Sequence, residues 1–468
     1  MSSPQPVKNY IVDETMSPYK IILILAWPVL LEQMLSTMIM YVNTAMVGSL
    51  GAYATAAASI SNPVFMMVNG IVISMGVGVT ALLARSVGAG DAERAKSLIR
   101  HAVMLIIYAG VPVGVLIGIF SHHIPLWMGA RVDVLYHATR YNVAIAFGRP
   151  FAIGLMIAGA AFRGRGDTRT PMIVNIGMNV MNILMNFLLI HPSREITVYG
   201  AVFNMPGVGL GVLGAGVSTT VSQICACSTL VFLLYKKQSP YRISLKENYK
   251  IDMALVRPIF SISWPAMLER LSMSGSGIIV TSSIASLGTA SLAANTLYLA
   301  AESMSFMPGF AFMTSITTMV GQCLGAKKEN LAKRYTYLTV LYATALLSLI
   351  AVFLYVFAEN ILSFFTPDKE VIALAVVCLR IVAFLQPIQV TAWVFAGALR
   401  GAGDTKYTLF ATAVCSWSIR ALGSFVCIRF FGLGLQHAVM CMFADATVRM
   451  ILLFTHFRSG KWRKAIKV

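Results

Sequence analysis

Twelve long apolar runs constrain the fold of this chain more than any other feature of its sequence. A helix needs about 20 mostly apolar residues to cross a hydrocarbon core of about 30 Å. Each run is long enough to do so, and together they predict an all-α polytopic membrane protein with twelve transmembrane helices. The runs cover residues 21–47, 56–84, 98–121, 135–162, 171–191, 209–235, 257–287, 293–322, 336–357, 370–399, 407–430 and 434–457.

The composition excludes a soluble protein of the same length. Apolar residues make up 57% of the 468 residues and charged residues only 12%, whereas soluble domains carry about 25% charged residues. The net charge of +18 does not predict nucleic-acid binding, because the basic residues form short clusters between the apolar runs. Seven cysteines show no C-x-x-C spacing, so neither a zinc site nor any other metal site is expected.

The basic clusters orient the chain in the membrane. Lysine and arginine concentrate in the N-terminal segment and after the second, fourth, sixth, eighth, tenth and twelfth runs. Such clusters mark the cytoplasmic side. We therefore expect a multi-pass protein of the cell (plasma or inner) membrane with both termini in the cytoplasm. Asp13 and Glu14 precede the first run, which argues against a cleavable signal peptide.

The two halves of the chain repeat each other at an offset of 237 residues. Residues 27–32 (WPVLLE) align with 264–269 (WPAMLE), and 163–168 (RGRGDT) with 400–405 (RGAGDT). Six runs per unit give both units the same orientation, which predicts a pseudo-two-fold axis along the membrane normal. We expect two six-helix bundles in a V around a central cavity. The N-lobe would span 1–240, a cytoplasmic linker 241–256, and the C-lobe with its basic tail 257–468.

The same residues carry a resemblance to a known family. The paired R-G-x-G-D-T motifs, residues 44–48 (TAMVG) and residues 320–322 (VGQ) before Gly325-Ala326 resemble the multidrug and toxic compound extrusion (MATE) family of the MOP superfamily. The resemblance covers nearly the whole chain. It implies a secondary active antiporter that exports organic cations, drugs or a related metabolite in exchange for H⁺ or Na⁺, by alternating access.

Two glutamates are the principal candidates for ion coupling. Glu32 and Glu269 occupy equivalent positions of the repeat near mid-membrane, where a charge costs about 2.5–3.5 kcal/mol even on the lenient insertion scale. Helical spacing places Ser36 and Asn43 on the face of Glu32, and Ser272 and Ser276 on the face of Glu269. Because burial disfavours the charged form of a carboxyl, either glutamate could exchange a proton near neutral pH.

A stripe of amides on the fifth run forms a second candidate binding surface. Spacings of four, three and four residues align Asn175, Asn179, Asn182 and Asn186 on one helix face. These amides could bind a cation or the transported compound, or simply form hydrogen bonds between helices. The resemblance implies that Asn43 and Asn186 replace aspartates typical of the proton-linked branch. It also implies that Gln389 replaces a second acid of the sodium-linked branch. Protons are favoured as the coupling ion, and sodium is the alternative.

The remaining charged residues in the runs have structural interpretations. Arg420 and Asp445 lie at similar depth on adjacent runs, and Arg449 lies one turn from Asp445, which predicts a structural ion pair. Glu302 could be a second cation ligand, a partner of Arg270, or a residue near the outer interface of the membrane.

Absent motifs bear on the alternative functions. The chain has no G-x-x-x-x-G-K-[ST], H-E-x-x-H or G-x-S-x-G, so neither direct use of ATP nor an enzyme is expected. The alternatives are a lipid-linked sugar flippase of the same superfamily and an intramembrane enzyme. A flippase would need several inward cations, whereas the stripes on the first, fifth and seventh runs are acidic or neutral. We expect a monomer in the lipid bilayer, with a small amphipathic cation as substrate and no cofactor besides the coupling ion.

Overall fold

The computed structural model describes residues 10–13, 16–198, 201–236, 241–244, 246–247 and 249–464. All twelve apolar runs lie on helices. In the first half these are α1 (Pro18–Gly48), α2 (Ala52–Ser59) with α3 (Asn62–Gly88), α4 (Ala92–Ile119), α6 (Val132–Gly164), α7 (Arg169–Leu189) and α8 (Val212–Tyr235). In the second half they are α9 (Met253–Ala285), α10 (Thr289–Gly325), α11 (Glu329–Val356), α13 (Lys369–Gly401), α14 (Thr405–Val414) with α15 (Leu422–Arg429), and α16 (Leu435–Ser459).

Smaller elements connect these helices. A π-helical segment, Cys415–Ala421, joins α14 to α15, and short helices α5 (His123–Trp127) and α12 (Ala358–Ser363) precede α6 and α13. An antiparallel hairpin of β1 (Pro192–Val198) and β2 (Ala201–Val208) connects α7 to α8. Within the described residues, ten candidate spans are apolar enough to cross a membrane. The ten do not include α9 and α10, which are equally long and carry Glu269, Arg270 and Glu302.

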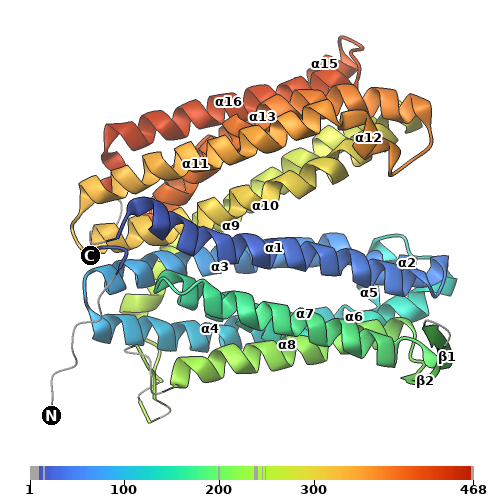
Figure 1. Cartoon of the computed structure of the whole chain (residues 1–468), viewed down its shortest axis with the longest axis horizontal. Helices are drawn as coiled ribbons and strands as arrows, with labels where there is room; N and C mark the ends of the chain where they lie inside the picture. The colour runs from blue at the N-terminus through green and yellow to red at the C-terminus, as the bar shows by residue number, and fades with distance from the viewer. Residues whose placement is uncertain are drawn as a thin grey trace.

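The helices form two groups arranged as a V. Figure 1 shows α1–α8 as one layer and α9–α16 as the other, side by side at one end and diverging towards the other end. The groups meet where α3 and α10 end. The predicted fold of twelve helices in a V is confirmed.

The first helix of each half begins against the opposite half. Ile22 and Leu25 of α1 pack in one buried cluster with residues of α10, α11 and α13. Ile259 and Ile262 of α9 pack with residues of α3, α4 and α6. The 237-residue offset relates the two pairs. Each of these helices therefore crosses from one group of helices to the other, which no periodicity within a single helix could reveal.

Backbones of the two groups touch where the V closes. A Cβ atom on Gly88 would lie 2.0 Å from the carbonyl oxygen of Gln322, and one on Gly325 would lie 2.0 Å from that of Arg85. Only glycine allows such close approach of two helices. The Gln322 side chain also donates to the Gly164 carbonyl at 3.0 Å, a group left without an intrahelical partner at the end of α6. We call this contact the seam.

Residues 10–12 reinforce the seam by bonding to both groups of helices. Tyr10 donates its hydroxyl to the Gly166 carbonyl at 2.7 Å, in the first R-G-x-G-D-T motif. Tyr335 of α11 donates to the carbonyl of Ile11 at 2.9 Å, and Lys328 donates to that of Val12 at 3.0 Å. The segment thus fastens the first half of the chain to the second at the closed end of the V.

Candidate functional site: a cavity between the two halves

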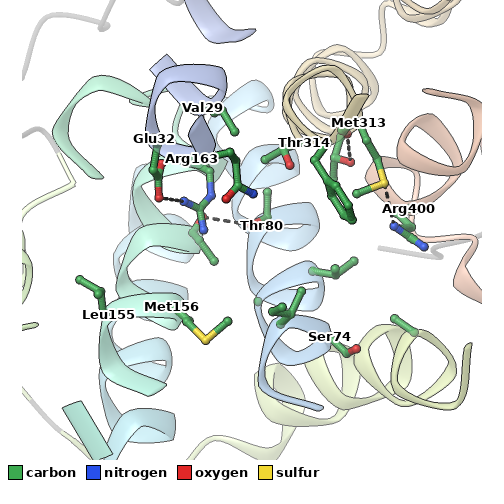
Figure 2. Close-up of a pocket in the computed structure, with 18 of the residues that line it drawn as sticks. Val29, Glu32, Ser74, Thr80, Leu155, Met156, Arg163, Met313, Thr314 and Arg400 are labelled. Carbon is green, nitrogen blue, oxygen red and sulfur yellow. Dashed lines mark hydrogen bonds and ion pairs between the residues drawn. The ribbon is translucent and has the colours of Figure 1, made fainter. Parts of the chain in front are cut away.

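A cavity of about 410 Å³ lies between the two groups of helices, next to the seam. We call it the floor cavity. Figure 2 shows Glu32 with Arg163 on one side and Arg400 on the other. The polar and aromatic lining of the floor cavity includes Glu32, Arg163, Asn175, Arg270, Phe310 and Arg400.

Glu32 is only half satisfied by its neighbours. One carboxylate oxygen accepts a hydrogen bond from the Asn175 amide at 2.7 Å and lies 3.8 Å from an Arg163 nitrogen. The other oxygen, Oε2, is buried and has no hydrogen-bond partner. A buried oxygen without a partner is costly. This carboxyl can therefore gain from a proton, or from a donor or cation on a bound compound.

Glu269 has quite different surroundings and does not line the floor cavity. Its side chain is buried, with the residue 4% exposed. Arg400 donates to Oε1 at 2.8 Å, Thr412 donates to the same oxygen at 3.0 Å, and Thr408 donates to Oε2 at 3.1 Å. Both oxygens are thus held by α13 and α14, and Glu269 positions the Arg400 guanidinium.

The two serines on the face of Glu269 form their hydrogen bonds with other groups. Ser272 accepts a hydrogen bond from the Trp417 indole at 2.8 Å, and Ser276 donates to the backbone of its own helix. The reason is that spacing along one helix shows which side chains share a face, but not which neighbouring helix supplies their partners. Donors on neighbouring helices form the hydrogen bonds of the Glu269 carboxylate instead.

The arginines of the two R-G-x-G-D-T motifs are the site residues that sequence reasoning missed. Both arginines directly follow predicted runs, 135–162 and 370–399, in segments expected to be cytoplasmic. The structure places Arg163 and Arg400 on the last turns of α6 and α13, each beside one glutamate. The signal that could have found them is the repeat, because one 237-residue offset relates both the glutamates and the arginines.

A second cavity, of about 550 Å³, lies within the first group of helices and is lined mainly by uncharged polar groups. We call it the N-lobe cavity. The Asn186 amide donates to the Asn43 oxygen at 2.8 Å, and Asn182 donates to Thr219 at 3.4 Å. The Asn179 amide nitrogen is buried without a partner. The polar lining of the N-lobe cavity includes Ser36, Asn43, Asn179, Asn182 and Asn186.

The amide stripe therefore lies against both α1 and α8, and it is divided between two cavities. Asn175 bonds Glu32 in the floor cavity, and Asn186 bonds Asn43 in the N-lobe cavity. Both contacts join residues 143 positions apart, as expected for two parallel helices in register. The stripe forms hydrogen bonds between helices and also lines space open to a ligand.

Gln389 and Glu302 lie outside both cavities. The Gln389 side-chain oxygen is buried without a hydrogen-bond partner, and the bonds of Glu269 go to other residues. Glu302 is 1% exposed, and neither of its carboxylate oxygens is hydrogen-bonded. The ion pairs between described residues do not join Glu302 to Arg270.

The three residues of the predicted structural ion pair are only partly brought together. Arg449 donates to Asp445 at 3.2 Å, one turn along α16, and both side chains are buried. Arg420, in the π-helical segment, lies outside ion-pair distance of Asp445 in the described structure, and its Nε atom is buried without a partner.

Comparison with known proteins agrees with this architecture. The chain is 28% identical to the probable multidrug resistance protein NorM of Thermotoga maritima, over 98% of this chain and 96% of that protein. It is 26% identical to the FAD transporter of Shewanella oneidensis, over 70% of each. A solved structure described as the outward-facing conformation of a multidrug resistance MATE family transporter of the MOP superfamily matches with a TM-score of 0.87. That match has 19% identity over 99% of this chain and all of that one.

The family model covers most of the chain and reproduces the internal repeat. The MatE model matches residues 28–188 and again residues 265–426. The two matches begin 237 residues apart, the offset found within the sequence. The chain therefore belongs to the MatE family of membrane transporters.

Proposed function

We propose that this transporter is a secondary active antiporter that exports small amphipathic organic molecules with a cationic group, in exchange for protons. The observation that carries the proposal is Glu32, whose carboxylate lines the floor cavity with one oxygen unpartnered. A cationic group of the cargo and a proton compete for this carboxylate. Each must leave before the other binds, so exchange is compulsory as the two lobes rock about the seam.

Protons fit the two glutamates better than sodium does. Hard cations prefer several oxygen ligands around a charged carboxylate. Here an arginine stands beside each carboxylate, at 3.8 Å from Glu32 and 2.8 Å from Glu269, and a guanidinium repels a metal cation. Neutralising Glu32 with a proton instead removes the cost of its burial. The N-lobe cavity offers sodium amide and hydroxyl oxygens, but its lining contains no carboxylate.

A lipid-linked sugar flippase is the second candidate, favoured by one observation. Three arginines line the floor cavity, and a pyrophosphate needs such charges. Two of the three have glutamate partners within 4 Å, which leaves little free charge for a group of two phosphates. The relative named as a probable multidrug resistance protein supports small organic cargo over a lipid.

Transport in everted membrane vesicles tests this proposal directly. We expect vesicles containing the protein to accumulate an amphipathic cationic dye when their interior is acidified, because export in the cell corresponds to uptake here. A sodium gradient at fixed pH should have no effect. Vesicles without the protein are the control. Accumulation that follows sodium and ignores pH would contradict proton coupling, and flipping of a lipid-linked sugar without dye movement would favour the second candidate.

We propose further that the seam faces the cytoplasm of a monomer in the cell membrane. The lobes would comprise residues 1–240 and 257–468, joined by 241–256, and no cofactor would be needed besides the coupling ion. The basic residues after the even-numbered spans support this orientation. Ala92, at the start of α4, tests it. A single cysteine at Ala92 should react with an impermeant thiol reagent in everted vesicles and not in intact cells. The reverse pattern would overturn the orientation.

A further inference from the structure

The charges that line the floor cavity do not balance. Arg163 faces Glu32, and Arg400 is bound by Glu269 from behind the cavity wall. Arg270 is the third arginine of the lining. None of the ion pairs or hydrogen bonds between described residues includes it. The cavity lining therefore holds three guanidinium groups, and Arg270 is the one without a direct ion-pair partner among the described residues.

The position of Arg270 leaves its donors available to a ligand. The Cβ atom of Arg270 packs against Gly70 of α3. A Cβ atom added to Gly70 would lie 3.9 Å from it. Its guanidinium lies over the Phe310 ring, 5.5 Å from the ring centre. This contact supplies no hydrogen-bond acceptor other than the ring face, and a guanidinium carries five N–H donors, so donors remain for a ligand. An unpaired charge at membrane depth is costly and is therefore a candidate functional group.

We propose that Arg270 binds a carboxylate of the transported compound, so that the cargo is an amphipathic zwitterion. Its cationic group would lie towards Glu32 and its carboxylate towards Arg270. The planar guanidinium offers two parallel N–H donors that match a carboxylate, and Phe310 provides an apolar surface for an adjoining ring. The inference rests on the proposed function and deepens it by naming the cargo class.

A zwitterion suits this cavity better than a plain cation or a plain anion. A plain cation would satisfy Glu32 but add a second positive charge beside Arg270. A plain anion would satisfy Arg270 but would be repelled by Glu32, and it would not compete with a proton there. A compound with both groups balances both residues. A proton on Glu32 still releases its cationic end, so exchange remains compulsory.

A matched pair of dyes tests the inference. The first is a rhodamine with a free carboxylate, which is a zwitterion, and the second is its methyl ester, which is a cation. Binding of each dye to purified full-length protein is measured by fluorescence polarisation. The Arg270→Gln variant should bind the zwitterion about tenfold more weakly, as expected for loss of one charge-assisted hydrogen-bonding group. It should bind the ester somewhat more tightly, because a repelling charge is gone.

Two further variants control for folding and for charge. Arg270→Lys keeps the charge without the planar fork, so it should recover part of the zwitterion affinity. Arg380→Gln removes an exposed arginine that lies over Tyr355 of α11, outside both cavities, and should change neither affinity. Equal weakening of both dyes in Arg270→Gln, an unchanged ratio of their affinities, or a wild-type protein that does not bind the zwitterion would overturn the inference.

Uptake of the ester by proteoliposomes separates this inference from the proposed function. Suppose that a pH gradient drives ester uptake while Arg270→Gln leaves the ratio of zwitterion to ester affinity unchanged. The antiporter proposal is then supported, and the proposed role of Arg270 is wrong. If the affinity ratio changes as expected while a pH gradient drives uptake of neither dye, Arg270 binds the anionic group and the proposal of proton coupling is wrong.

Discussion

Replacing Glu32 with glutamine will abolish transport driven by a pH gradient and leave the protein folded. Glutamine keeps the size of the side chain and its bond with Asn175, but it cannot bind and release a proton. It also removes the negative charge that attracts the cationic group of the cargo. In proteoliposomes, dye uptake driven by an inside-acid lumen should fall to the level of protein-free liposomes. The thermal midpoint should change little, because the Arg163 contact, at 3.8 Å, is long.

The equivalent glutamate of the other half is the matched control. Glu269→Gln should chiefly lower stability, because it leaves Arg400, whose side chain is 12% exposed, without its ion-pair partner at 2.8 Å. Breaking a buried ion pair in this way costs about 3–5 kcal/mol. We therefore expect a lower thermal midpoint for Glu269→Gln but not for Glu32→Gln. Normal proton-driven uptake by the Glu32→Gln variant would show that its carboxyl is structural. Loss of coupling in a fully stable Glu269→Gln variant would move the coupling site to the second lobe.

The sequence predicts the helices well because each membrane span is a property of one continuous segment. All twelve predicted runs lie on helices, including α9 and α10, whose polar residues lower their hydropathy. The repeat predicts which residues are equivalent, such as Glu32 with Glu269. Equivalence is a relation along the chain, and it does not say which side chains touch. The site therefore required the structure.

Contacts between helices account for the differences between the site predicted from the sequence and the site in the structure. Arg163 and Arg400 lie on the last turns of their helices, next to loops that the sequence predicts to be cytoplasmic. Their long side chains nevertheless reach Glu32 and Glu269. The equivalent glutamates also differ in exposure to the cavity, because Thr408 and Thr412 of α14 hold Glu269, whereas Asn175 alone bonds Glu32 from α7. Two halves with the same motif therefore have different chemistry, and only the first presents a carboxylate to the cavity.

Replacing Gly325 with alanine will prevent the seam from closing. The added methyl group would lie 2.0 Å from the Arg85 carbonyl oxygen and 2.8 Å from the Ala89 nitrogen, both backbone atoms that cannot rotate away. Overpacking of this kind costs about 1–3 kcal/mol, and each 1.4 kcal/mol shifts a two-state equilibrium about tenfold. The cost falls only on the state with a closed seam. We therefore expect the open-seam state to accumulate and transport to fall about tenfold or more.

A cysteine at Ala84 can report the state of the seam. Ala84 is fully buried opposite Gly321 of α10, so its thiol reacts only when α3 and α10 separate. In a background without the seven native cysteines, Gly325→Ala should speed labelling of this thiol and slow transport together. Gly177→Ala is the matched control, since a Cβ atom on Gly177 would meet nothing within 4 Å, and it should change neither rate. Because alternating access requires the seam to open and close, a variant with slow labelling and normal transport would mean that the glycine contact is not part of the gate.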